Sequence, residues 1–113
     1  MKYTNLEYLK TISNGDSAFV LKTINSFIED LRWSMPKIQN QVATENWSGL
    51  AASIHTIRPS FSIIGSKVLE DSFKLMEDCV LAKINLWLLP VIVEEVCGLS
   101  EKIISELQQE KLL

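Results

Sequence analysis

The side chains that could do chemistry gather around His55, which is the only histidine among the 113 residues. Arg58 lies three residues further on, so on a helix its guanidinium comes within one turn of the imidazole. A neutral imidazole offers a ring nitrogen as a nucleophile, and a nearby guanidinium can stabilise negative charge. The pair could therefore take part in nucleophilic chemistry, provided that the ring of His55 faces solvent.

The helical pattern around His55 predicts that the ring does face solvent. At about 100° per residue, the apolar residues of this stretch fall within about 40° of a common line. They are Leu50, Ile54, Ile57, Phe61 and Ile64. His55 lies about 140° from Leu50 and shares its side of the helix with Pro59 and Ser62, which are compact or polar.

The elements before this stretch are also helical. Apolar spacing predicts a short leading helix over 6–12, followed by a turn at 14–16 with the sequence NGD. Asp16 is expected to cap a long helix whose apolar stripe runs through 20–42. Pro36 lies within that stripe, so we expect this helix to continue through the proline with a kink.

Three further helices complete the chain. Asn46 is the expected N-cap of the helix that carries the histidine, Gly65 its C-terminal stop, and Ser66 the cap of the next helix. Pro90 fits the first turn of the last helix. These elements predict an all-α fold, an antiparallel four-helix bundle with a short additional N-terminal helix, in a single domain of residues 1–113.

Composition narrows the partners and the compartment. The net charge is −3 and no run of Lys or Arg occurs, which argues against a nucleic-acid partner. No apolar leader follows the N-terminus, and the most apolar stretch, 84–93, is too short to span a membrane. Cys79 and Cys97 lack the spacing of a redox motif, so we expect two buried free thiols in a reducing cytoplasm. Trp33, Trp47 and Trp87 are interpreted as packing residues.

The spacing around His55 resembles the signature of histidine-containing phosphotransfer domains. That family has an aliphatic residue two positions after its phosphorylated histidine and Lys or Arg at the third, which Ile57 and Arg58 match. A glycine at the tenth position is matched by Gly65. The likeness covers nearly the whole chain. It includes NGDSAFVLKTINSFIEDL (14–31), NWSGLAASIH (46–55) and Met76-Glu77.

One position departs from the family pattern. Pro59 stands where the family usually has glycine, and proline has no amide to donate to the carbonyl of His55. The departure puts the docking geometry in question more than the chemistry, because His55 and Arg58 are both present.

The resemblance implies a phosphorelay carrier. His55 would accept a phosphoryl group from a receiver-domain aspartate or a kinase and pass it to another receiver-domain aspartate, and Arg58 would stabilise the phosphate. The implied partners are response-regulator receiver domains and a sensor or hybrid histidine kinase. The receiver would supply Mg²⁺, so no cofactor or metal is expected on this chain, which we expect to be a monomer. Without a glycine-rich phosphate loop, autonomous kinase activity is not expected.

The expected docking surface surrounds His55. It comprises Ala51, Ala52, Pro59, Ser62 and Glu77. Glu77 could orient the imidazole through a hydrogen bond, or it could be a solvated helix carboxylate. Arg58 could likewise be a solvated surface charge.

A second interpretation assigns no chemistry to His55. The chain would then be a helical interaction module that binds proteins without phosphorylation. Acid-labile labelling by a phosphorylated receiver would separate the two interpretations. A hydrolase or metal enzyme is disfavoured, because a single histidine with no ligand-spaced carboxylates near it provides no site.

Overall fold

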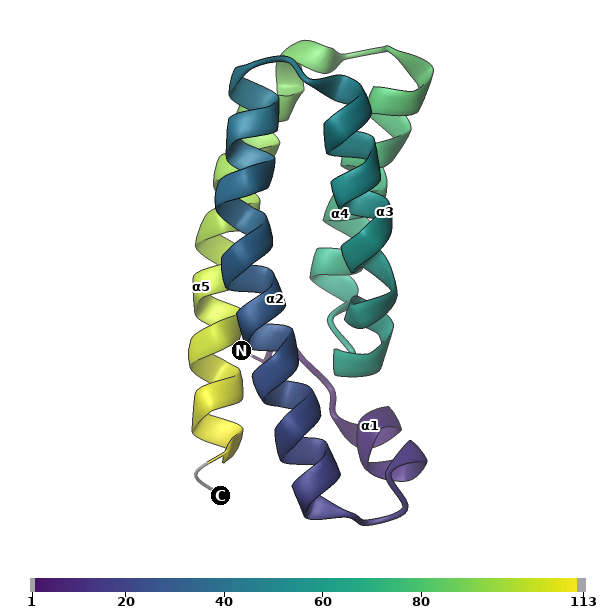
Figure 1. The fold of residues 1–113 in the computed structure, drawn as a ribbon, viewed down its shortest axis with the longest axis vertical. Helices are drawn as coiled ribbons and strands as arrows, with labels where there is room; N and C mark the ends of the chain where they lie inside the picture. The colour runs from purple at the N-terminus through teal and green to yellow at the C-terminus, as the bar shows by residue number, and fades with distance from the viewer. Residues whose placement is uncertain (1, 112–113) are drawn as a thin grey trace.

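The computed structural model describes residues 2–111, and all regular structure in that range is helical (Figure 1). It contains five α-helices and one 3₁₀ turn: α1 (Glu7–Ile12), α2 (Ser17–Ala43), α3 (Trp47–Ile64), α4 (Lys67–Ala82), η1 (Leu86–Leu88) and α5 (Leu89–Lys111). The predicted all-α class is confirmed, with four long helices and a short leading one.

The four long helices form an elongated bundle in which consecutive helices run in opposite directions (Figure 1). α3 packs against α2 and α4, and α5 packs against the same two helices from the other side. The bundle measures 43 × 23 × 22 Å. The short helix α1 lies at one end, in contact with α2 and α3.

The helix ends follow the predicted local chemistry. The Asp16 carboxylate accepts a hydrogen bond from the amide of Phe19 at 3.1 Å, and the Asn46 side chain accepts one from the amide of Gly49 at 3.1 Å. Ser66 caps α4 in the same way. These polar atoms satisfy amides that a helix start would otherwise leave unpaired.

Gly65 ends α3 in the left-handed conformation, with a φ of 70°. A Cβ at this position would lie 2.1 Å from the carbonyl oxygen of Asn5, so only glycine lets the leading segment pass this close. The amide of Asn5 donates to the carbonyl of Ile64 at 3.2 Å. The end of α3 is thereby fixed to the N-terminal segment.

Neither interior proline ends its helix. α2 continues through Pro36 and α3 through Pro59, while Pro90 occupies the first turn of α5 as predicted. Burial of an apolar face by neighbouring helices can offset the hydrogen bond that a proline removes.

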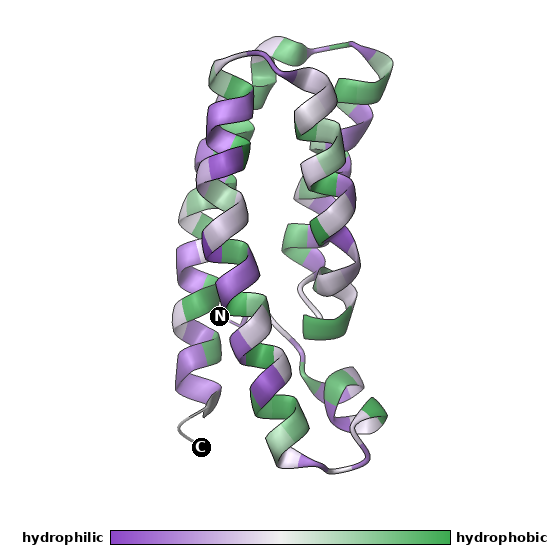
Figure 2. Cartoon of the chain, in the orientation of Figure 1, coloured by the Kyte–Doolittle hydropathy of each residue, from purple (hydrophilic) through white to green (hydrophobic). Residues whose placement is uncertain are grey.

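All five α-helices contribute to one apolar core. At its centre the ring of Phe61 on α3 lies between Phe27 on α2 and Phe73 on α4, at centroid distances of 6.2 and 4.7 Å in edge-to-face geometry. Green apolar and purple polar residues alternate along each helix in Figure 2, as amphipathic packing requires. This packing sets the rotation of α3 about its axis, so the opposite face must point outward.

The N-terminal segment is fastened to α5 by a carboxylate. Glu106 accepts hydrogen bonds from the amide of Tyr3 at 2.9 Å and from the hydroxyl of Thr4 at 2.7 Å. Lys2 pairs with Glu110 at 2.6 Å, and this ion pair raises the pKa of the lysine. Residues 2–4 are therefore fastened to α5.

The two cysteines carry free thiols. Cys79 is buried as expected, whereas Cys97 is only half-buried, and burial raises the pKa of its thiol. Between residues 2 and 111, no helix combines the length and the apolar character that crossing a membrane requires.

Candidate functional site

His55 projects into solvent from the middle of α3. Its side chain is 87% exposed, whereas its neighbours Ile54 and Ile57 are buried in the core. The exposed orientation that the helical pattern predicted is confirmed. The ring is therefore accessible to a partner without any rearrangement of the bundle.

Arg58 and Glu77 form an ion pair beside the imidazole. Nη1 of Arg58 on α3 donates to Oε1 of Glu77 on α4, and the two side chains are 29% and 12% exposed. Nε of Arg58 is buried, with no hydrogen-bond partner in the part of the chain that the structure describes. Interpreting either group as a freely solvated charge is therefore wrong.

Glu77 also faces the imidazole. Its Oε2 lies 3.8 Å from Nδ1 of His55, which is too long for a hydrogen bond. An orienting hydrogen bond, which was one of the two interpretations of Glu77, is not formed in this arrangement. One carboxylate thus lies between the guanidinium and the imidazole, with an oxygen directed to each.

A shallow hollow of about 270 Å³ lies next to the ring, lined by His55, Arg58, Pro59, Ser62 and Glu70. The hydroxyl of Ser62 donates to Oε1 of Glu70 at 3.2 Å, so this polar pair spans α3 and α4. We refer to Arg58, Ser62, Glu70 and Glu77 as the α3/α4 flank of His55.

The expected docking residues divide between outward and inward positions. Ala52, Pro59 and Ser62 are exposed around His55. Ala51 is half-buried against the core, and Glu77 is held between α3 and α4 by its ion pair. The structure thus places small side chains at the surface near the ring, and the carboxylate below it.

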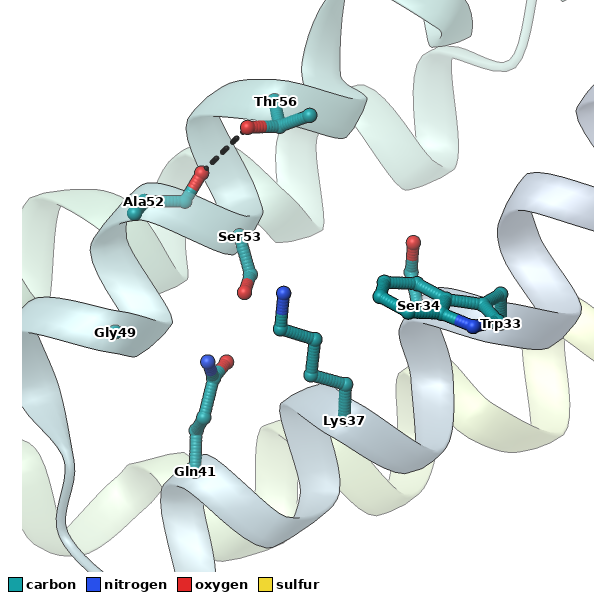
Figure 3. A pocket seen from close by; sticks show the side chains of 8 residues that line it. All are labelled: Trp33, Ser34, Lys37, Gln41, Gly49, Ala52, Ser53 and Thr56. Carbon is teal, nitrogen blue, oxygen red and sulfur yellow. Dashed lines mark hydrogen bonds between the residues drawn. The ribbon is translucent and has the colours of Figure 1, made fainter.

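A second depression, of about 230 Å³, lies between α2 and α3. We call it the α2/α3 groove. It is lined by Trp33, Ser34, Lys37, Gln41, Gly49, Ala52, Ser53 and Thr56 (Figure 3). Ala52 and Thr56 belong to the same helix as His55, so the groove is next to the candidate site.

The interpretation of the three tryptophans as packing residues is confirmed for one of them only. Trp47 packs against the core, but Trp33 and Trp87 are 71% and 75% exposed. Trp33 lies in the α2/α3 groove, where Nζ of Lys37 is 4.9 Å from the centroid of its ring. Sequence reasoning missed this pair as part of a candidate surface.

Comparison of the chain with models of protein families, with curated proteins and with solved structures found no match. The geometry around His55 and the resemblance of its flanking sequence are therefore the features from which a function can be inferred.

Proposed function

We propose that this chain is a cytoplasmic phosphorelay carrier in which His55 accepts a phosphoryl group and passes it on. The observation that carries the proposal is an imidazole 87% exposed on a long helix, with an Arg–Glu pair directly beneath it. A nucleophile that must meet an aspartate on another protein has to be accessible in this way, and its surroundings have to be held in position.

The proposed step needs one ring nitrogen as nucleophile. Nδ1 is the nitrogen that faces Glu77, so Nε2 is the one that can attack from the solvent side. A bond forms between Nε2 and phosphorus, and the acyl-phosphate P–O bond of the donor breaks. The electron pair of that bond leaves with the donor aspartate as a carboxylate. In the tautomer that attacks through Nε2 the proton is on Nδ1 and stays there, so the ring gains positive charge during the attack.

The α3/α4 flank supplies the charges that this step requires. Glu77 is the carboxylate next to Nδ1, where the positive charge develops, and it stabilises that charge. Arg58 is held by Glu77 at the base of the hollow, and its other N–H groups are suited to the phosphoryl oxygens. The partner, by the family resemblance a receiver domain, supplies the aspartate and Mg²⁺.

Labelling by a small phosphodonor and by receivers tests the proposal. Wild-type protein is incubated with phosphoramidate, and separately with purified receiver domains phosphorylated by acetyl phosphate. We expect acid-labile, base-stable phosphate on His55, located by mass spectrometry, and none on His55→Gln. No labelling of the wild type by any receiver, or equal labelling of the variant, would contradict the proposal.

The second candidate function is a binding module without phosphorylation. The exposed Trp33 next to a lysine favours it, because exposed aromatic residues are common at protein interfaces. On this alternative a partner would bind equally well to wild type and to His55→Gln, and neither protein would be labelled.

A further inference from the structure

We propose that the α2/α3 groove is a second contact site for the protein that exchanges phosphoryl groups with His55, and that it takes an acidic side chain of that protein. The inference rests on the proposed function and adds the chemistry by which the partner is recognised. Three features of the groove carry it: a cation without an ion-pair partner in the part of the chain that the structure describes, a buried acceptor without a hydrogen bond there, and an exposed aromatic ring.

The cation is Lys37. Its ammonium lies over the ring of Trp33, and none of the ion pairs between residues 2 and 111 includes it. Among residues 2–111, no carboxylate lines the groove. The positive charge is therefore available to an acidic side chain from outside, and a carboxylate is its complementary partner.

The acceptor is Gln41. The residue is only 7% exposed, yet its Oε1 has no hydrogen-bond partner among the described residues. Buried polar atoms are nearly always paired, so an unpaired one facing a groove indicates a missing donor. Figure 3 shows the amide of Gln41 and the ammonium of Lys37 pointing into the same space between the helices. The surface of the oxygen is shielded from solvent, so a backbone N–H of the partner reaches it once the side chain turns toward the groove.

The aromatic ring is Trp33, which is 71% exposed and forms the outer end of the groove (Figure 3). Large aromatic residues that become covered on binding contribute much of the affinity of protein interfaces. Here the ring offers apolar surface next to a charge, which suits an acidic loop that also carries an apolar residue.

The position of the groove determines which protein covers it. On α3, Ala52 lies almost one turn before His55 and Thr56 directly follows it, and both line the groove. A protein that brings an aspartate to the ring from solvent therefore approaches this surface as well. The partner that carries the phosphoryl group is the occupant to which we assign the groove.

Matched substitutions test the assignment. The variants Lys37→Glu and Trp33→Ala are compared with Lys22→Glu and Trp87→Ala, which alter an equivalent charge or ring outside the groove. Lys22 precedes Lys37 by fifteen residues on α2, about 22 Å along the helix. Phosphoryl transfer from receiver domains, phosphorylated with acetyl phosphate, is measured at low and high salt.

We expect each groove variant to slow transfer from the receiver about tenfold or more, and each control to stay near wild type. The defect of Lys37→Glu should shrink in high salt, because salt screens the charge pair. Labelling of His55 by phosphoramidate should be unchanged in all four variants, since this small donor does not need the groove.

Four outcomes would overturn the assignment, and they are distinguishable. Groove variants that accept phosphate from receivers at the wild-type rate would remove the groove from docking and leave the proposed function intact. A parallel loss with phosphoramidate would show that the substitutions act on His55 itself. A wild-type dimer that Trp33→Ala converts to a monomer in sedimentation would assign the groove to a second copy of this chain. A wild type labelled by no receiver would refute the proposed function, and this inference with it.

Discussion

The two sides of His55 differ in how their polar groups are satisfied. On the α3/α4 flank, Arg58 pairs with Glu77, and Ser62 donates to Glu70. In the α2/α3 groove, Lys37 has no ion-pair partner within residues 2–111, and Oε1 of Gln41 has no hydrogen bond. Nε of Arg58 also lacks a hydrogen bond among the described residues, but each charged group of the flank has a partner side chain, whereas the cation of the groove has no ion-pair partner and can take one from another molecule.

This difference separates chemistry from recognition. A charge that must act on a transferring group is most effective when it is already held in place, because no reorganisation is needed during the reaction. A recognition surface instead gains affinity by leaving groups for a partner to satisfy. Substitutions of Arg58 or Glu77 should therefore affect every phosphodonor, and substitutions in the groove should affect protein donors only.

The largest effect is expected from His55→Gln, which removes the only imidazole of the chain. Phosphoryl acceptance should be abolished with phosphoramidate and with receivers alike. The free energy of unfolding should change by no more than about 0.5 kcal/mol, because the side chain is 87% exposed. Urea denaturation and acid-labile labelling measure the two quantities, and retained labelling would place the acceptor at another residue.

The next largest effect is expected from Arg58→Ala. The phosphoryl oxygens lose a charge-assisted hydrogen bond of roughly 1.5–3 kcal/mol, so the transfer rate should fall about ten- to a hundredfold. The change also leaves the carboxylate of Glu77, only 12% exposed, without its cation. Arg58→Lys should recover much of the rate, because a point charge can reach the same oxygens. Single-turnover kinetics with one receiver and with phosphoramidate should show the same ranking, and an unchanged rate in Arg58→Ala would assign all neutralisation to the partner.

A smaller effect, of about tenfold, is expected from Glu77→Gln, with Glu70→Gln as the matched control on the same helix. The ring loses the carboxylate that stabilises its developing positive charge, and Arg58 loses its ion-pair partner. Thermal denaturation should show that Glu77→Gln is less stable by about 1–3 kcal/mol, since a partly buried guanidinium is left unpaired. Glu70→Gln should be close to wild type in both assays, because its hydrogen bond with Ser62 is exposed. Equal behaviour of the two variants would mean that Glu77 has no special role.

Much of the fold could be predicted because its signals are local. Asp16, Asn46 and Ser66 each cap the helix that follows, and Gly65 adopts the left-handed conformation that its position after α3 suggested. The exposure of His55 followed from the period of one helix alone. None of these features depends on how the helices are placed relative to one another.

The Arg58–Glu77 pair could not be predicted from spacing, because it joins residues 19 apart on two helices. Its formation depends on the rotation of α4 against α3, which the packing of Phe61 against Phe73 sets. Nor did the sequence indicate which of the four carboxylates on α4 (Glu70, Asp71, Glu77 and Asp78) would take the guanidinium. Family resemblance singled out Glu77 as a neighbour of the histidine, but not as the partner of the arginine.

The groove was missed for a different reason. Trp33 was interpreted as a packing residue from its type, although the helical period that placed His55 outside also applies to α2. Trp33 lies about 200° from Leu31, which is fully buried on the core stripe of that helix. The signal for an exposed tryptophan was therefore present in the sequence.

The smallest effect on transfer is expected at Pro59, where the chain departs from the pattern that it resembles. α3 continues through this residue, which is exposed and lines the hollow next to His55. Pro59→Ala restores an amide that can donate to the carbonyl of His55, and a proline interior to a helix costs about 3 kcal/mol relative to alanine. The variant should gain less stability than this, because the bundle already accommodates the proline and because alanine leaves the unfolded chain more conformational freedom. We therefore expect the free energy of unfolding to rise by about 1–2 kcal/mol. Labelling by phosphoramidate should stay within about twofold of wild type, because the imidazole and the Arg58–Glu77 pair are unchanged. Urea denaturation and initial labelling rates measure the two effects. A large loss of labelling in a more stable protein would show that the proline shapes the α3/α4 flank itself, and the flank would then depend on a backbone feature as well as on its ion pair.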